Sequence, residues 1–454
     1  MKKDTAVIGT QPIGGLLARF SFPAILSVLS LTILTITDRY FIGTYIGESA
    51  LAGLMAALPF VVLIAATERL ISVGGAIVFS NSLGAKKISR AGRILGNTFL
   101  LSLLSGLLLA VLGFIFLEPI LVLKGASGAV LNYATEYTSV ILSLSVFSVA
   151  GYGMNGFVRA SGRPGFAMFS VLTAIVMNII LDYLFIVEFG WGMRGAGLAT
   201  VLSAAILAVM VVGFLVGKSV AVRLTLDKMK PNFKAIKKVL LFGVSPFTFE
   251  FSFAVTSTVF NGMLLFYAGP AGLAAFGISG MAIYWLSIRP MIGLTQAMEV
   301  IMAYNFGAAK LDRVKQTLWI GLSWGTGWGA FCAAVFAVFA PEFVSIFTAD
   351  AQLQNLTVVL IRLCAIALPF AAAYHIADTA LLSVGEYKKS FIFNITRETI
   401  IGMTFFISLP LLFGLNGVLS SIAVTDTVGG IIGGLVIIWV YKNMNKIHLH
   451  NAIR

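Results

Sequence analysis

The sequence predicts an all-α polytopic membrane protein, with twelve transmembrane helices in two six-helix lobes around a central cleft. Composition is the first reason. Of the 454 residues, 59% are hydrophobic and only 11% are charged, whereas a soluble domain is roughly 45–50% apolar and about 25% charged. A soluble fold of this composition would lack polar residues to cover its surface, which excludes a soluble enzyme, a disordered chain, a coiled coil and a disulfide scaffold. The other two reasons are the apolar runs and an internal repeat.

Twelve apolar segments are long enough to cross a bilayer, which takes about 20 residues in a helix. None of them alternates between apolar and polar residues, as the strands of a membrane β-barrel do. The predicted spans are 17–43, 50–82, 95–117, 128–158, 165–188, 195–217, 239–267, 272–304, 317–340, 353–383, 390–413 and 417–441.

The basic residues predict a multi-pass protein of the plasma (inner) membrane with both termini in the cytoplasm. Lys and Arg are enriched in cytoplasmic connections. If the N-terminus is inside, most of the 31 basic residues fall in inside segments, Lys2, Lys3 and Arg454 among them, and the outside loops hold only Lys124 and Arg194. Because membrane topology accounts for the clusters, the net charge of +13 does not indicate a nucleic-acid partner.

Motifs of soluble catalysis are absent from the sequence: it has no P-loop, no paired-cysteine metal motif and no nucleophile elbow. We therefore expect no enzyme activity, no cofactor and no metal-binding cysteine site. Cys332 and Cys364 both lie within apolar runs and are interpreted as small core residues. Without an ATP site, the energy for transport is expected to come from an ion gradient.

The two halves of the chain resemble each other at a constant offset of 223 residues. Pro23 matches Pro246, Ser82–Arg90 matches Asn305–Arg313, and Gly162 matches Gly385. The predicted organisation is an N-lobe (1–217), a basic cytoplasmic linker (218–238), a C-lobe (239–441) and a cytoplasmic tail (442–454). Six helices per half make the repeat parallel, which is a known plan of transporters that expose a cleft to each side in turn. Such a repeat weighs against a channel or receptor.

A set of oxygen-bearing residues is predicted to converge in the outer half of the first lobe. Asp38 lies near the outer end of the first helix, Asp182 near that of the fifth, and Thr200 about five residues into the sixth. Asn178 lies one turn before Asp182 on the same helix face. Two buried carboxylates repel each other, and a proton or a hard cation such as Na⁺ relieves that repulsion. The counterparts of Asp38, Asn178 and Asp182 at the repeat offset are Asn261, Ile401 and Phe405, so the first lobe alone is expected to couple to the ion.

Other polar residues within apolar spans are weaker candidates. Any of them could line the cleft and contact substrate, or simply bridge helices: Glu250, Glu299, Tyr374, His375 and Asp378. Arg397 and Glu398 are neighbours in the sequence, but neighbours on an α-helix point in different directions, so adjacency does not predict an ion pair.

Several motifs resemble the multidrug and toxic compound extrusion (MATE) family, in particular its DinF-like branch with the MepA-like pumps. The motifs are TDRYFIGTYIG (Thr37–Gly47), SLGAKK (Ser82–Lys87), FVRASGRP (Phe157–Pro164), MNIILDYLF (Met177–Phe185) and WGMRGAGLAT (Trp191–Thr200). The resemblance implies a two-lobe antiporter that expels organic, often cationic compounds, with the cation held at positions matching Asp38, Asn178, Asp182 and Thr200. One departure is Tyr183, where the family often has Pro.

The combined interpretation is a proton- or sodium-coupled antiporter that exports organic, cationic amphipathic compounds by alternating access. Its expected partners are a small organic substrate and membrane lipid, and it is expected to act as a monomer. The alternatives are a flippase for lipid-linked oligosaccharides or lipids of the same superfamily, which would need a strongly cationic cavity, and, less favoured, a channel or receptor.

Overall fold

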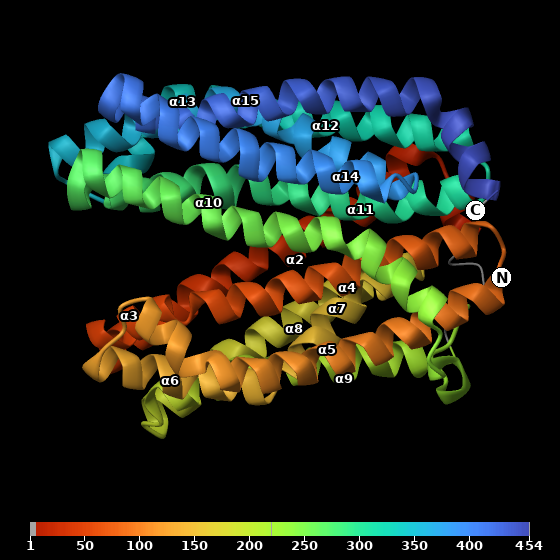
Figure 1. Cartoon of the computed structure of the whole chain (residues 1–454), viewed down its shortest axis with the longest axis horizontal. Coiled ribbons are helices and arrows are strands. Elements are labelled where there is room, and N and C mark those ends of the chain that lie inside the picture. The colour runs from red at the N-terminus through yellow and green to blue at the C-terminus, as the bar shows by residue number, and fades with distance from the viewer. Residues whose placement is uncertain (1–5, 219, 454) are drawn as a thin grey trace. The chain divides into compact units, whose positions relative to one another are not determined.

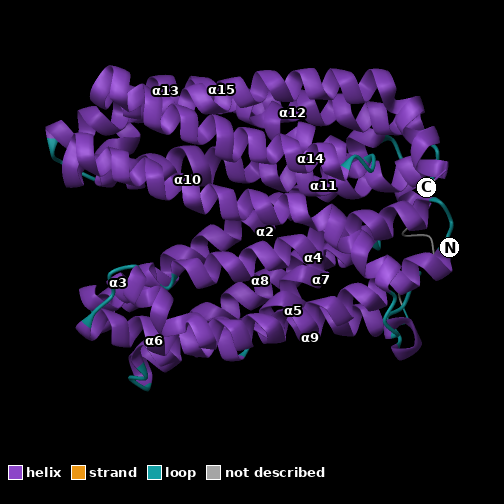
Figure 2. Cartoon of the chain, viewed as in Figure 1, coloured by secondary structure: helices purple, strands orange, loops and turns teal. Residues whose placement is uncertain are grey.

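The computed structural model describes residues 6–218 and 220–453, and this part of the chain forms helices and short connections without a strand (Figure 2). Lys2, Lys3 and Arg454, which entered the prediction of orientation, lie outside the described residues. The α-helices, labelled as in Figure 1, are α2 (Ile13–Phe41), α3 (Glu48–Ala56), α4 (Leu58–Gly84), α5 (Ile88–Leu123), α6 (Gly128–Ser143), α7 (Ser145–Ala160), α8 (Pro164–Asp182), α9 (Gly192–Val216), α10 (Phe233–Gly280), α11 (Arg289–Gly307), α12 (Leu311–Ser345), α13 (Ala351–Ser383), α14 (Tyr387–Asn394) and α15 (Gly402–Ile453). Wider π-helical turns occupy Ile42–Ile46, Tyr183–Glu188, Met281–Ile288 and Ile395–Ile401, and short 3₁₀ turns occupy Val7–Gly9 and Leu226–Met229.

The described helices provide the twelve membrane crossings that the sequence predicts. Nine continuous helical segments are long and apolar enough to cross a membrane, and the bent pair α6–α7 makes a tenth. Two of them, Phe233–Gly307 and Tyr387–His450, have 75 and 64 residues, enough for two crossings each at about 20 residues per crossing. Gly269 and Gly414 interrupt these two segments with positive φ, a conformation that glycine adopts without strain. The predicted fold class is confirmed.

Some helix boundaries differ from the prediction. The predicted span 50–82 is two helices, because the chain breaks at Ala57 before Pro59 of α4, and proline favours the first turn of a helix. The predicted span 128–158 bends by 59° between α6 and α7. Helix α10 already begins at Phe233, within the predicted linker, and α15 continues through the predicted tail to Ile453.

The chain forms two compact units. Unit 1 contains Ser30–Phe247 and the described residues before Gln11, and unit 2 contains Gln11–Leu29 and the described residues from Thr248 onward. Helices α2 and α10 therefore contribute residues to both units. In unit 1, α7 packs against α4, α5 and α9, and the rings of Phe79 and Phe157 meet edge to face at 5.2 Å.

The core of unit 2 is built from α12, α13 and α15, which pack side by side. Its central cluster combines aromatic and aliphatic side chains such as Phe260, Phe336 and Leu360. Cys332 and Cys364 are free thiols buried in the same cluster. This core holds in place the polar side chains of unit 2 described below.

The predicted linker is docked onto α5. The side-chain amide of Asn97 donates to the carbonyl oxygens of Lys228 and Lys230, both at 3.2 Å, and its oxygen accepts from the Asn232 N–H at 2.6 Å. Gly96 lies directly beneath Lys228, where a side chain would overlap the linker backbone. The basic residues of the linker are therefore held against the start of α5.

Helices α4 and α10 approach each other closely within unit 1 because both carry glycine at the contact. A Cβ atom added to Gly243 would overlap the carbonyl oxygen of Leu70, and one added to Gly74 would overlap the backbone around Val239 and Gly243. Small residues of this kind let membrane helices pack backbone against backbone.

We predict that Gly243→Ala lowers the unfolding temperature of the detergent-solubilised protein, because overpacking costs about 1–3 kcal/mol. The matched control is Gly213→Ala on α9, where an added Cβ atom meets nothing within 4 Å. Alanine there is expected to be neutral or to stabilise the helix by up to about 1 kcal/mol. Equal unfolding temperatures of the two variants, measured by tryptophan fluorescence, would contradict the close approach of α4 and α10.

Candidate cation-binding site

Two aspartates of unit 1 lie at the ends of regular helices, each followed by a π-helical turn. Asp38 is in the last turn of α2, directly before the turn Ile42–Ile46, and Asp182 is the last residue of α8, directly before the turn that begins at Tyr183. Asp182 is only 1% exposed, and Asp38 is partly buried. Because π-helical turns are rare and occur frequently at functional sites, both carboxylates stand in a special backbone setting.

Asn178 joins the two carboxyl groups. It is 1% exposed and lies one turn before Asp182 on α8. Its amide orientation is assigned from its hydrogen-bond partners: the nitrogen donates to Asp38 Oδ1 at 3.0 Å and to Asp182 Oδ2 at 3.1 Å, and the oxygen accepts from the Thr200 N–H at 3.3 Å. The carboxyl groups of Asp38 and Asp182 are also hydrogen-bonded to each other. Three helices thus meet at one amide.

Thr200 contributes differently from the expectation. Its backbone N–H binds Asn178, whereas its hydroxyl group donates to the Ala196 carbonyl oxygen at 3.0 Å. Tyr137, on α6, adds a side chain that the sequence reasoning missed: it is 6% exposed, hydrogen-bonds to the Thr200 side chain and lies within electrostatic reach of both aspartates. Nothing in its spacing distinguishes Tyr137 from other tyrosines, because its partners are distant in the sequence.

The chemistry of this cluster follows from its excess of acid. A hydrogen bond between two carboxyl groups requires that one of them carries a proton, because two bare carboxylates in contact repel each other strongly. Asn178 can donate to both groups whichever of them holds the proton. The structure therefore brings together the four residues that the sequence singled out, and their role in cation coupling stays a prediction.

The five weaker candidates are distributed over three helices of unit 2. Glu250 lies on α10 and Glu299 on α11, and both are partly buried. The other three lie on α13. The His375 ring contacts the Tyr374 ring at a centroid distance of 5.0 Å, and Asp378 accepts a hydrogen bond from the Ser390 hydroxyl group.

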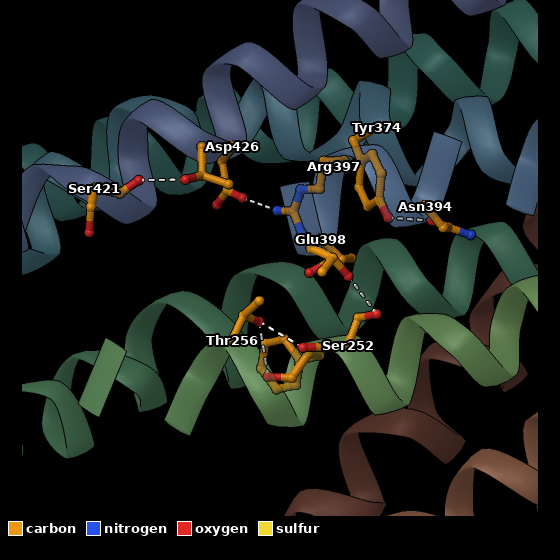
Figure 3. A network of polar contacts seen from close by, with 11 residues as sticks. Ser252, Thr256, Tyr374, Asn394, Arg397, Glu398, Ser421 and Asp426 are labelled. Atoms are coloured by element: carbon orange, nitrogen blue, oxygen red, sulfur yellow. Dashed lines mark hydrogen bonds and ion pairs between the residues drawn. The ribbon is translucent and has the colours of Figure 1, made fainter. Parts of the chain in front are cut away.

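A second buried polar cluster, centred on Arg397, occupies unit 2 (Figure 3). The guanidinium group pairs with Glu398 through Nη1 and with Asp426 of α15 through Nη2, and it lies 4.4 Å from the centre of the Tyr374 ring. The Tyr374 hydroxyl group donates to Asn394. Glu398 is 4% exposed and Tyr374 is 1% exposed, so Tyr374 lies inside this cluster. Two carboxyl groups share one fixed cation here.

The sequence gave no reason to expect an ion pair between the neighbours Arg397 and Glu398, but the structure shows one. Both residues lie in the π-helical turn Ile395–Ile401. A π-helical turn is wider than an α-helical turn, so consecutive side chains diverge less in direction. The signal was missed because the angle between neighbouring side chains was taken from a regular α-helix.

Unit 2 also contains an apolar cavity of about 520 Å³. Residues from the first half of α2, from α11 with the preceding turn, and from α12 line it, among them Phe22, Trp324, Trp328 and Phe331. Sites for small organic molecules are commonly cavities of about 300–1,000 Å³ with largely apolar walls. The cavity is thus of a size and character that suit an organic compound.

Twelve crossings, an internal repeat, and a buried carboxyl pair without a catalytic motif define a membrane transporter, not an enzyme. The sequence model of the MatE family matches the chain twice, at residues 23–184 and 246–407. These matches begin 223 residues apart, which is the offset of the repeat. The chain belongs to the MatE family of transporters.

Relatives and solved structures of this family resemble the chain along nearly its whole length. The chain is 27% identical over 433 residues to the multidrug export protein MepA of Staphylococcus haemolyticus, covering 95% of this chain and 94% of that protein. It is 25% identical over 428 residues to MepA of Staphylococcus aureus, covering 94% of each. Among solved structures, a MATE protein in complex with MaL6 has a TM-score of 0.93 at 21% identity, covering 98% of this chain and all of that chain. An outward-facing multidrug resistance MATE family transporter of the MOP superfamily has a TM-score of 0.92 at 22% identity, covering 98% and 99%.

We predict that Arg397→Met strongly destabilises the protein, because it leaves Glu398 and Asp426 buried without their cation. Removal of one partner from a buried ion pair costs about 3–5 kcal/mol. Arg362→Met is the matched control, since Arg362 is exposed and only donates to the Ala337 carbonyl oxygen at 3.1 Å. A denaturation midpoint of Arg397→Met as high as that of the control would show that Arg397 does not hold the cluster.

Proposed function

We propose that the chain exports organic compounds across the membrane in exchange for protons that load at Asp38 and Asp182. The observation that carries the proposal is the direct contact of these two carboxyl groups with Asn178 bonded to both. Such a pair gains or loses one proton without losing its partners. A buried pair of this kind is an expected proton relay in a transporter.

The orientation of Asn178 favours a proton over Na⁺. A sodium ion needs oxygen ligands, but the amide turns its N–H groups toward both carboxylates and its oxygen toward the Thr200 N–H. The Thr200 hydroxyl hydrogen is directed at the Ala196 carbonyl oxygen. Only the carboxylate oxygens remain for a metal ion, which is too few for a closed coordination shell, whereas a proton needs no more.

The substrate class follows from the relatives and from the cavity. The relatives at 25–27% identity are described as multidrug export proteins, and the cavity of unit 2 has apolar, tryptophan-rich walls. Lipophilic organic cations fit both observations, because aromatic faces attract cations as well as apolar surface. We therefore propose export of cationic amphipathic compounds.

The proposed cycle has two half-steps. Proton binding neutralises the excess charge of the Asp38–Asp182 pair and favours the state that releases substrate to the outside. Loss of the proton to the cytoplasm restores the charge and favours the state that takes up new substrate. In this scheme the chain lies in the inner membrane with both termini in the cytoplasm, as its distribution of Lys and Arg suggests.

We predict that Asp38→Asn and Asp182→Asn each reduce proton-driven efflux at least about tenfold, as expected when an essential proton carrier is removed. The assay is uptake of the fluorescent cation ethidium into proteoliposomes, with a pH gradient and a Na⁺ gradient imposed separately. Glu118→Gln is the matched control, because it removes an exposed carboxylate from α5 of the same unit.

Three outcomes of this assay are informative. Loss of transport in both aspartate variants, with a normal control, supports the proposal. Transport by Asp182→Asn at the wild-type rate overturns the assignment of the site. Transport driven by the Na⁺ gradient alone retains the site and replaces the proton by sodium.

A further inference from the structure

A group of basic side chains gathers where α5 begins in unit 1. Lys87 directly precedes α5 and Arg90 lies in its first turn, while Lys238 of α10 is partly buried within electrostatic reach of both. None of these three forms an ion pair with a carboxylate of the described residues. Three like charges held together in this way repel one another, so the arrangement is unfavourable unless an anion joins it.

The internal repeat provides a comparison for Arg90. Its counterpart at offset 223 is Arg313, whose Nε donates to Asn305 Oδ1 at 2.8 Å and whose Nη2 donates to the Gln11 carbonyl oxygen at 2.7 Å. In unit 1 the place of Asn305 is taken by Ser82, whose hydroxyl group donates to the Val78 carbonyl oxygen. The position that satisfies a guanidinium group in unit 2 thus leaves it open in unit 1.

The start of α5 adds backbone donors to these three charges. No side chain caps this helix, since Lys87 at the cap position makes no side-chain hydrogen bond to it. The first N–H groups of a helix have no partners within it, and the helix dipole makes this end favourable for an anion. Phosphate oxygens can accept from N–H groups and from Arg and Lys at the same time.

Exposed apolar side chains flank the basic group. Leu226 and Phe233, at the two ends of the docked linker, are each 83% exposed, and Ile88 at the start of α5 is 41% exposed. The turn between α4 and α5 joins two membrane-crossing helices, so it lies at the membrane surface. Basic groups beside exposed aromatic and aliphatic residues are typical of contacts with a lipid headgroup and its upper acyl chain.

We propose that Lys87, Arg90, Lys238 and the N-terminus of α5 bind the phosphate group of an anionic phospholipid. This set is named the α5 anion site. The adjacent apolar residues favour a lipid over a soluble phosphate or an acidic protein segment. The site shares no residue with the Asp38–Asp182 pair, and its occupancy is independent of the coupling ion.

The test measures the affinity of the full-length protein for phosphatidylglycerol by native mass spectrometry and by lipid-induced shifts of the unfolding temperature in mixed micelles. The triple variant Lys87→Gln/Arg90→Gln/Lys238→Gln is expected to bind this lipid about 100-fold more weakly, because each basic group near a membrane surface contributes about a factor of five. The single variant Arg90→Gln keeps the test valid if the triple variant does not fold, with an expected loss of about fivefold.

The control removes the same charge elsewhere. Lys388→Gln/Lys442→Gln/Lys446→Gln changes three basic residues of unit 2 and should leave the affinity nearly unchanged. Loss of binding confined to the α5 variants supports the site. Equal losses in both triple variants, wild-type affinity for phosphatidylcholine as high as for phosphatidylglycerol, or inorganic phosphate that binds as tightly as the lipid would each overturn it.

Discussion

A carboxylate buried among apolar helices requires a compensating positive charge, and each unit of this protein contains a cluster organised around that requirement. In unit 2, Arg397 lies between Glu398 and Asp426 and rests on the Tyr374 ring (Figure 3). In unit 1, Asp38 and Asp182 contact each other with only the neutral amide of Asn178 between them. A guanidinium group is part of the chain and stays, whereas a proton can leave. This difference makes unit 1 the place for an exchangeable ion.

The repeat shows how one backbone plan accommodates two sets of polar groups. The family model matches both halves at the offset of 223 residues, and the non-glycine residues Lys86 and Ala309, one offset apart, both have positive φ. The side chains at equivalent places have nevertheless diverged. Arg313 is bound by the protein, whereas its counterpart Arg90 is not. Packing against neighbouring helices fixes the backbone, but the polar side chains are free to serve different purposes in each unit.

Two of the four residues at the candidate cation site could be related from the sequence with little more than helix geometry. Asn178 and Asp182 are one turn apart on one helix, so their common face follows from the period of the α-helix. Asp38 and Thr200 were placed by depth, which depends only on the rise per residue. Depth could not show that Thr200 contributes its N–H and not its hydroxyl group. Tyr137 could not be found either, because its contact depends on how α6 packs.

The sequence by itself determined the membrane class, the twelve crossings and the repeat, because each of these depends on apolar content and spacing that can be counted along the chain. Only the tertiary structure decided that Arg397 and Glu398 pair in a π-helical turn. It also decided that the linker is held to α5 by Asn97 and that Lys238 joins Lys87 and Arg90. These contacts depend on where side chains from distant helices meet and on local departures from α-helical geometry, and neither leaves a periodic signal in the sequence.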